Sequence, residues 1–184
     1  MKIEELRQLI NEHIENEEYE KSLDFCCSLI KEHEGELTAG DLINKGLCHF
    51  RLDQNDEAVA CFDRALQIEP ENIMALTNKA VSLYNLGKIE ESFKLFGQVL
   101  TRDHDVFPAW YYIGLYNLKK FSNSADAGAK AIVVNAYRQV IRMAPDFGSF
   151  AIHDPAKGID YTLELFLLLN DDIPDLSVEE ITAL

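Results

Sequence analysis

Four cysteines and the histidines near them are the side chains best suited to binding a metal ion. They are Cys26, Cys27, Cys48 and Cys61, with His33 and His49 nearby in the sequence. There is no CxxC pair, and adjacent Cys26 and Cys27 cannot easily direct both thiols to one metal ion from a helix. We therefore predict no metal site, and we expect reduced, partly buried thiols of the kind found in cytoplasmic proteins.

Carboxylates are the most numerous charged groups, with 32 Asp and Glu residues against 17 Lys and Arg. Runs such as Glu15-Asn16-Glu17-Glu18 are typical of a solvated helix end, and no pair of carboxylates stands out as an acid and a base. The sequence lacks the GxSxG, GxxxxGK[ST], HExxH and GxGxxG motifs. It therefore predicts a protein that is not an enzyme and that needs no cofactor.

The composition predicts a folded, strongly acidic protein. Of the 184 residues, 47% are hydrophobic, and the formal net charge is -15. Phosphate backbones and anionic membranes attract Lys and Arg, so this charge argues against both as partners. It favours a basic or apolar protein partner.

Two features of the sequence bear on localisation. The first ten residues, MKIEELRQLI, place acidic side chains where a secretory signal has an apolar core. The longest strongly apolar run, Leu163–Leu169, is far shorter than the ~20 residues that cross a bilayer. We therefore expect a soluble, cytoplasmic protein.

Two stretches of the sequence are nearly the same. LINKGLCHF (42–50) and LTNKAVSLY (76–84) share Leu, Asn and Lys at corresponding positions, 34 residues apart. Self-similarity at such a period indicates a repeat architecture.

The residues after the first of these stretches predict a helical hairpin. Small and large residues alternate at helical spacing, as in Ala58 and Phe62, which is typical of a helix packed tightly against a neighbour. Gly46 and Ala58 fall where two antiparallel helices approach closely. Asp56 is the predicted N-cap of the second helix, and Pro70 ends it.

This pattern resembles the tetratricopeptide repeat family over about residues 3–145. The residues that carry the resemblance are, copy by copy, Leu6, Leu9, Ile10, Tyr19, Ser22, Cys26 and Leu29; Leu42, Gly46, Ala58, Phe62, Ala65 and Pro70; Leu76, Ala80, Leu83, Gly87, Ser92 and Phe96; and Trp110, Ile113 and Gly114.

The resemblance implies an all-α fold, a right-handed superhelical solenoid of about four antiparallel helix pairs with a C-terminal capping helix. We expect one domain, 1–184. Its predicted parts are repeats at residues 3–36, 39–72, 73–106 and 107–147, and a capping helix and tail at 154–184.

The fourth repeat is longer than the second. Gly114 to Pro145 spans 31 residues, whereas Gly46 to Pro70 spans 24, so seven extra residues lie near 119–131. The Ser, Asn and Gly content of this stretch predicts a surface loop.

The C-terminal part departs from the repeat pattern. Asp154 and Pro155 predict the start of a helix that runs to about Asn170 and covers the exposed side of the last hairpin. Its apolar side chains are more than one helix face buries, so a dimer contact through this end is an alternative. These side chains are Leu165, Phe166, Leu168 and Leu169.

The last residues predict a further short helix. Ser177 and Glu180 have capping-box spacing, so the helix should start after Ser177, with Val178, Ile181 and Leu184 on one stripe. Such a helix is unstable alone. It packs on the capping helix, occupies a partner groove of its own or a neighbouring molecule, or frays.

The resemblance also implies a binding surface, because in this family the first helices of the pairs line a concave face that binds peptides or helices of partner proteins. The positions carried over by repeat phase are Arg7, Asn11, Ile43, Asn44, Leu47, Phe50, Met74, Thr77, Asn78, Val81, Tyr84, Tyr111, Tyr112, Leu115 and Lys119. Tyr111 and Tyr112 are the expected aromatic anchors. Asn44 and Asn78 recur at one phase, where their amides could bond a partner's backbone or a neighbouring helix.

One branch of the family, the co-chaperones that clamp a partner's C-terminal carboxylate, uses a basic residue and Asn, then Asn, then two basic residues. Arg7, Asn11 and Asn44 match the first half of this pattern. Met74 and Asn78 stand where the last two basic residues belong. Those cations supply charge-assisted bonds to the carboxylate, so we predict that the clamp is not formed here.

The sequence as a whole predicts a protein–protein interaction module, an adaptor or scaffold that binds a partner peptide or helix on its concave face. We expect it to bind neither nucleic acid nor membrane, and to be a monomer or a homodimer. The alternatives are a structural protein that self-assembles through its C-terminal end, and a regulatory subunit of an enzyme.

Overall fold

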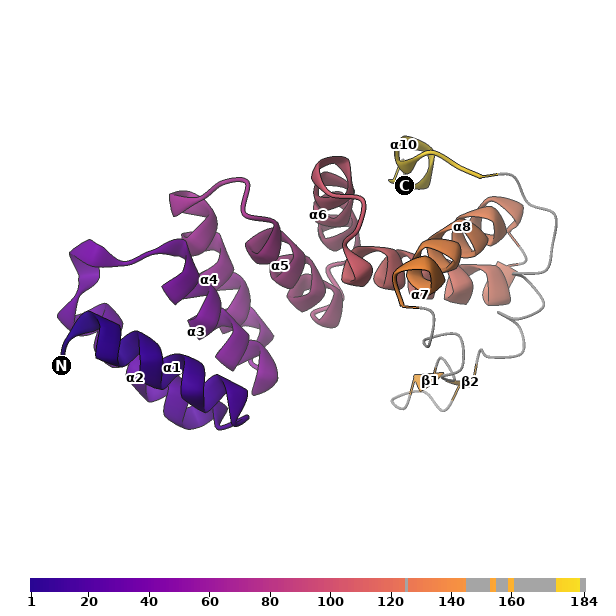
Figure 1. Cartoon of the computed structure of the whole chain (residues 1–184). Coiled ribbons are helices and arrows are strands. Elements are labelled where there is room, and N and C mark those ends of the chain that lie inside the picture. The colour runs from indigo at the N-terminus through magenta and orange to yellow at the C-terminus, as the bar shows by residue number, and fades with distance from the viewer. Residues whose placement is uncertain (125, 145–152, 155–158, 161–174, 183–184) are drawn as a thin grey trace. The chain divides into compact units, whose positions relative to one another are not determined.

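The computed structural model describes residues 1–124, 126–144, 153–154, 159–160 and 175–182. Their elements are α1 (Ile3–Glu15), α2 (Tyr19–Glu32), the 3-10 helix η1 (Glu34–Glu36), α3 (Ala39–Arg51), α4 (Asn55–Ile68), α5 (Ile73–Asn85), α6 (Ile89–Arg102), α7 (Phe107–Ser124), α8 (Ala127–Met143), β1 (His153–Asp154), β2 (Ile159–Asp160) and α10 (Val178–Thr182), as Figure 1 shows. Apart from one two-residue β pairing, the described chain is all-α, which confirms the predicted fold class. The chain divides into two compact units, unit 1 (Met1–Leu95) and unit 2 (Phe96–Leu184).

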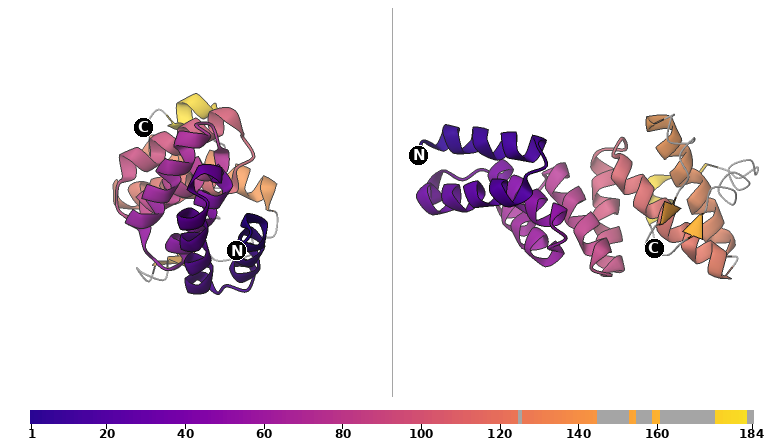
Figure 2. Two further views of the ribbon diagram at one scale, coloured as in Figure 1. Left: turned by 90° about the vertical axis from the view of Figure 1, so that its left-hand side faces the viewer. Right: turned by 90° about the horizontal axis from the view of Figure 1, so that it is seen from below.

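In unit 1, the helices α1 to α5 succeed one another in space in the order of the sequence. Each packs against the next, and consecutive helices run in opposite directions (Figures 1 and 2). This is the stack of helical hairpins that the 34-residue period predicts.

The turn between the two helices of a pair has the same backbone in all three hairpins that begin in unit 1. Its middle residue is in the left-handed region, at φ 58° in Glu17, 60° in Asp53 and 76° in Gly87. The next residue's N–H then donates back to the carbonyl five residues earlier, as from Gln54 to His49 at 2.9 Å. This is the geometry of a helix C-terminus closed by a left-handed residue.

The predicted N-cap of the second helix was wrong by two residues. The helix α4 begins at Asn55 and is preceded by Gln54, so Asp56 lies within its first turn. The left-handed turn at Asp53 reverses the chain so tightly that the next helix starts almost at once. The end of α4 at Ile68, two residues before Pro70, agrees with the prediction.

The two helices of a pair touch where the sequence has small residues. A Cβ added to Gly46 of α3 would lie 2.6 Å from the Phe62 ring of α4, so only glycine fits there without a shift. In the neighbouring hairpins a serine makes the same crossing, because Ser22 Oγ donates to the Ile10 carbonyl (3.1 Å) and Ser92 Oγ to the Ala80 carbonyl (2.7 Å).

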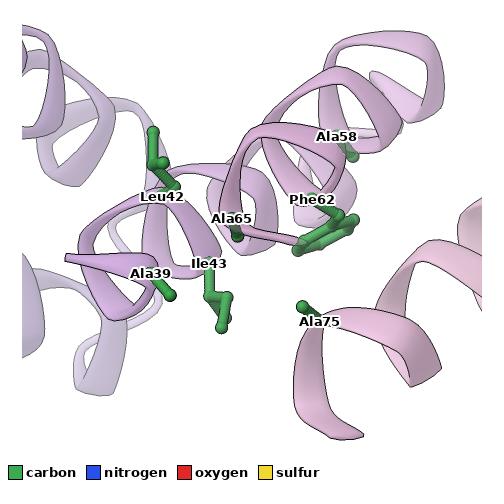
Figure 3. Close-up of a cluster of buried hydrophobic side chains, with 7 residues drawn as sticks. All are labelled: Ala39, Leu42, Ile43, Ala58, Phe62, Ala65 and Ala75. Carbon is green, nitrogen blue, oxygen red and sulfur yellow. The ribbon is translucent and has the colours of Figure 1, made fainter. Parts of the chain in front are cut away.

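The core of the second hairpin is built from both of its helices and the next helix in the chain. Figure 3 shows the buried side chains of this cluster, which come from α3, α4 and α5. They are Ala39, Leu42, Ile43, Ala58, Phe62, Ala65 and Ala75, all buried. Four of the seven are alanines, which lets the helices approach closely around the single large ring of Phe62.

Unit 2 repeats the close glycine contact. A Cβ on Gly114 of α7 would lie 2.7 Å from the Tyr137 ring of α8, as Gly46 does with Phe62. The two glycines are 68 residues apart and the two rings 75, so the seven extra residues lie between Gly114 and Tyr137.

The insertion lengthens the helices and does not form the predicted surface loop. The helices α7 and α8 have 18 and 17 residues, against 13 and 14 in α3 and α4. The prediction gave too much weight to Ser, Asn and Gly, because α8 starts at a good N-cap. Asp126 accepts a hydrogen bond from the Ala129 N–H at 3.0 Å, and this cap sets the start of α8 at Ala127.

The helix predicted to start at Asp154–Pro155 is not present at Asp154 or at Ile159–Asp160, the residues described there. His153 and Asp154 form a strand instead, paired antiparallel with Asp160 and Ile159. The remainder of that helix, 161–170, lies outside the described residues, as do the four apolar side chains of the dimer alternative.

The predicted C-terminal helix is confirmed. The helix α10 begins directly after Ser177, and the capping box is reciprocal. The Ser177 N–H donates to Glu180 Oε2 (2.7 Å), and the Glu180 N–H donates to Ser177 Oγ (3.2 Å). Its flanking residue Leu176 contacts α8, because the Leu176 N–H donates to Asn135 Oδ1 at 2.9 Å. The predicted packing on the capping helix involves residues outside the described ones.

Candidate partner-binding surface

The helix α1 carries a hollow on the side of its two predicted binding residues. The hollow has a volume of about 530 Å³ and is lined by one stripe of the helix, Glu4, Arg7, Gln8, Asn11, Glu12 and Glu15. Three of these six side chains are carboxylates, and Arg7 is their one cation. The charge that the hollow presents to a ligand therefore depends on whether Arg7 is available.

Arg7 is held by groups of the protein itself. Its Nε donates to Asp41 Oδ1 at 2.9 Å and its Nη2 to Asp41 Oδ2 at 2.8 Å, a bidentate pair between α1 and α3. Its Nη1 donates to Glu4 (3.1 Å), and Nη2 also reaches the Glu36 carbonyl (3.2 Å). The guanidinium is thus occupied on each of its nitrogens, and a ligand carboxylate would have to compete with Asp41 for it.

Asp41 is the residue of this surface that the sequence analysis missed. Its side chain is only 6% exposed, and it accepts hydrogen bonds from Thr38 N and Thr38 Oγ1, both at 2.9 Å. Burial disfavours its charged form, but the hydrogen bonds from Arg7 and Thr38 outweigh burial and hold the pKa of Asp41 below its ordinary value. The signal was present in the sequence, because Thr38 and Asp41 have capping-box spacing at the start of α3.

The amides Asn11 and Asn44 bond to each other. Asn44 Nδ2 donates to Asn11 Oδ1 at 3.0 Å, across the same α1–α3 junction as the Arg7–Asp41 pair. Two partners were predicted for the Asn44 amide, a peptide backbone or a neighbouring helix, and the structure shows a bond to the neighbouring helix α1. Two polar links therefore hold the first helices of consecutive hairpins together here.

The predicted positions on α3 differ in how much they offer a partner. Ile43 is part of the buried core cluster, so it offers a partner little surface. Leu47 and Phe50 are half-buried, and Phe50 packs against the same cluster. Leu47 and Phe50 are therefore the apolar side chains among the predicted positions of α3 that a partner could partly contact.

The helix α5 shows the same division. Thr77 and Val81 are buried, whereas Asn78 and Tyr84 are half-buried. Met74 is 62% exposed, an unusual state for a large apolar side chain and one suited to an adaptable contact.

The predicted anchors of unit 2 lie in a row of aromatic rings. Phe107 and Tyr111 stack with centroids 6.1 Å apart, Tyr111 meets Tyr112 edge-on at 5.3 Å, and Tyr112 stacks on Phe96 at 5.7 Å. Both tyrosines are half-buried. Burial, and then the neighbouring Tyr111, raise the pKa of Tyr112, so its phenol is neutral at physiological pH. The rings are thus braced by one another and still present a face to solvent.

The other two predicted positions on α7 flank this row at different depths. Leu115 is half-buried, and Lys119 is exposed at the lengthened end of the helix. Trp110 is buried and its Nε1 donates to the His104 carbonyl at 2.7 Å, which fixes the start of α7.

The cysteines are free thiols in the described chain, and three of the four are buried. Cys48 Sγ donates to Ser22 Oγ at 3.3 Å between α3 and α2. The adjacent Cys48 sulfur and burial raise the pKa of Cys26, and burial raises that of Cys61, so both stay protonated. Within the described residues, no group of three or more His, Cys, Asp or Glu side chains is placed to hold a metal ion.

None of the helices in the described part of the chain combines the length and the apolar character needed to span a lipid bilayer.

Comparison with known proteins gives one family match and one curated relative. A family model described as the tetratricopeptide repeat matches residues 42–72, the hairpin of α3 and α4. The chain is 26% identical over 135 residues to the protein STIP1 homolog of Dictyostelium discoideum. That alignment covers 68% of this chain and 23% of the relative, so the chain spans about a quarter of the relative's length.

Two solved structures share the fold. One is YrrB, described as a TPR protein with an unusual peptide-binding site, with a TM-score of 0.59 and 18% identity over 74% of this chain and 66% of that one. The other is a double mutant of MamA RS-1, with a TM-score of 0.66 and 16% identity over 91% of this chain and 92% of that one.

Proposed function

We propose that this chain is a tetratricopeptide repeat protein, a class of protein–protein interaction modules, and that it is an adaptor that binds a partner peptide on the face of its first helices. The observation that carries the proposal is the aromatic row of α7. Tyr111 and Tyr112 are half-exposed, edge-to-face and braced by Phe107 and Phe96. Rings already held in place lose little conformational entropy on binding, which suits anchor residues.

The partner we propose is basic and apolar. The hollow of α1 offers Glu12 and Glu15, while its cation Arg7 is paired with Asp41. The net charge of -15 attracts a cationic peptide over longer distances. Met74 on α5 and the tyrosines of α7 supply apolar contacts within their own units. The peptide-binding site named for YrrB, whose fold this chain shares, is a further support.

Recognition of a C-terminal carboxylate is not part of the proposal. In addition to the missing cations at Met74 and Asn78, Arg7 already holds a carboxylate of the protein. We therefore expect the bound peptide to be an internal segment, or one whose terminal carboxylate makes no contribution.

The binding test is a panel of fluorescent peptides measured by polarisation against the full chain. The panel pairs basic-apolar sequences with acidic-apolar ones, each made with a free and an amidated C-terminus. We expect binding of the basic-apolar set alone, with equal affinity for the free and amidated forms. Binding that is lost on amidation would contradict the assignment of Arg7.

The site is tested with the double variant Tyr111→Ala/Tyr112→Ala. Losing two aromatic anchors should weaken peptide binding by about 2 kcal/mol or more, some thirtyfold. A matched control is Tyr19→Ala, because Tyr19 is a half-buried tyrosine on the second helix α2. Far-UV circular dichroism checks that helicity is kept. Unchanged binding by the double variant would exclude α7 as the site.

A cytoplasmic location and the lack of catalysis belong to the same proposal. Free thiols at Cys26, Cys27, Cys48 and Cys61 support a reducing compartment. The self-assembly alternative depends on residues outside the described chain, so light scattering of the full chain is its direct test.

A further inference from the structure

The segment 175–182 lies against α8, the second helix of the hairpin in unit 2. Asp175 pairs with Arg138 Nη1 at 3.2 Å, and the Leu176 N–H donates to Asn135 Oδ1 at 2.9 Å. Asn135 is itself buried, and its Nδ2 donates to the Ala131 carbonyl at 3.0 Å. A buried amide with one end fixed by its own helix and the other bonding the segment's backbone is a specific receptor group.

The segment owes its order to this contact. The helix α10 has five residues, far below the ~12–15 at which an isolated helix becomes marginally stable in water. Yet Ile181 is only 1% exposed. So short a helix cannot bury a side chain to that degree by itself, so other parts of the chain cover Ile181.

The segment contacts α8 at the position where, in unit 1, the first helix of the next hairpin contacts α4. Arg138 is next to Tyr137 in the chain as Asp63 is next to Phe62, and these two rings make the equivalent glycine contacts. Asp63 pairs with Lys79 of the next first helix, α5, at 2.5 Å. In unit 2 the pair is Arg138 with Asp175, so the segment lies where the next hairpin would begin, with the charges reversed.

We propose that this side of α8, around Asn135 and Arg138, is a peptide-docking site whose occupant is the chain's own residues 175–182. The ligand chemistry is that of the occupant, an acidic residue followed by Leu and a Ser-capped helical turn, with Ile four residues after the serine. The ion pair is solvated, with Asp175 92% exposed, and α10 is only five residues long, so the bound segment exchanges with a free peptide of the same pattern. The inference does not rest on the proposed function of the first helices.

The probe is a fluorescent peptide of residues 173–184, titrated into full-length protein. In the parent the tethered segment competes at a high effective concentration, so the peptide should bind poorly. In the variant Ile181→Asp the tethered segment loses its anchor, and the peptide should bind at least about tenfold more tightly than to the parent. A peptide carrying the same Ile181→Asp change should bind neither protein.

Two further variants keep the test decisive if Ile181→Asp disturbs folding. Asp175→Ala combined with Ser177→Ala changes only exposed positions and should also open the site. Adding Arg138→Glu to that protein should weaken binding of the parent peptide several-fold and should favour a peptide with Asp175→Arg instead. Tyr111→Ala/Tyr112→Ala should leave this binding unchanged, which separates it from the proposed function. A folded, opened variant that does not bind the peptide, or a parent that binds it equally well, would overturn the proposal.

Discussion

The hairpin α3–α4 of unit 1 and the hairpin α7–α8 of unit 2 keep the same central contact, but they differ in length and in the segment that covers the second helix. In each, a glycine of the first helix meets an aromatic ring of the second, Gly46 with Phe62 and Gly114 with Tyr137. The unit 2 helices are longer by five and three residues. A full helix, α5, covers α4, whereas the short segment 175–182 lies on α8.

This comparison identifies the part of a hairpin in which the distance between the two helices is constrained. The glycine–ring contact fixes how closely the helices approach, so it tolerates no added side chain. The ends near the turn lie beyond that contact, and there the helices extend without disturbing it. The cover of the second helix depends on residues elsewhere in the chain, since Ala75 of α5 completes the core cluster of unit 1 (Figure 3).

The largest expected effect comes from filling the shared contact. Gly46→Leu forces four carbons into the Phe62 ring, whose first neighbour is already 2.6 Å from a built Cβ. Overpacking of this kind costs ~1–3 kcal/mol, and we expect the upper end because Phe62 is fully buried. Thermal unfolding followed by circular dichroism measures the loss.

The same helix supplies the control for this experiment. Gly40 of α3 has only Thr38 Oγ1 near a built Cβ, at 3.6 Å, so Gly40→Leu should be tolerated. Gly114→Leu should destabilise unit 2 as Gly46→Leu destabilises unit 1. If Gly46→Leu melted at the parental temperature, the two hairpins would not share a glycine–ring contact that limits their approach.

The next largest effect concerns a charged residue that only one of the two hairpins has. Asp41 of α3 has no counterpart on α7, where the position 68 residues on is the buried Ala109. Asp41→Asn should cost about 2 kcal/mol at neutral pH, because it removes charge-assisted bonds with Arg7 and Thr38.

The pH dependence of that cost has a definite sign. The folded-state pKa of Asp41 lies below its unfolded value of about 3.9, so its stabilisation is complete above that pH. It is lost as the pH falls through the lowered folded pKa, where the carboxylate takes up a proton. The difference in unfolding free energy between parent and Asp41→Asn, measured by urea at several pH values, should therefore shrink only below about pH 4. A difference independent of pH would mean that the ion pair contributes nothing.

Local sequence patterns were sufficient to predict the helical hairpins of unit 1 and the helix after Ser177. The spacing of Gly46, Phe62 and Pro70 is a local pattern, and it determines the packing directly. The insertion was misjudged because composition predicts loop, whereas the cap at Asp126 decides where a helix starts. The strand at His153–Asp154 depends on pairing with residues further along, which no local pattern shows.

The binding surface was less predictable than the fold. The two positions of α1 that repeat phase selects, Arg7 and Asn11, lie on the stripe that lines the hollow. Repeat phase could not reveal that Asp41 pairs with Arg7, or that Ile43 belongs to the core. Both facts depend on how closely α3 packs against the neighbouring helices. The repeat phase predicts the direction in which a side chain leaves the helix axis. Whether that side chain can bind a partner depends on the groups that it already contacts.

The third effect, of about 1 kcal/mol, concerns the turn that joins a pair. Glu17 and Gly87 occupy equivalent left-handed positions, and only glycine adopts them without strain. Glu17→Gly should therefore stabilise the protein by about 0.5–1 kcal/mol, and Gly87→Ala should destabilise it by about 1 kcal/mol. Glu36→Gly, in η1 outside these turns, is the control. Equal melting temperatures for Glu17→Gly and the parent would show that the turn is not strained.

The smallest effect tests whether the segment on α8 replaces a first helix. Asp63–Lys79 in unit 1 and Arg138–Asp175 in unit 2 join equivalent positions of a second helix to the segment that covers it, with opposite charge order. Both pairs are partly solvated, so double-mutant cycles should give coupling energies of about 0.5 kcal/mol, falling with salt. The charge reversals Asp63→Lys/Lys79→Asp and Arg138→Asp/Asp175→Arg should each recover most of the stability that the single changes lose. Because Lys79 is anchored in a 13-residue helix and Asp175 in a short segment, the unit 1 coupling should be the larger. Zero coupling for Arg138–Asp175 together with a measurable value for Asp63–Lys79 would contradict the equivalence, and docking of the segment would then depend on contacts other than this ion pair, such as the hydrogen bond to Asn135.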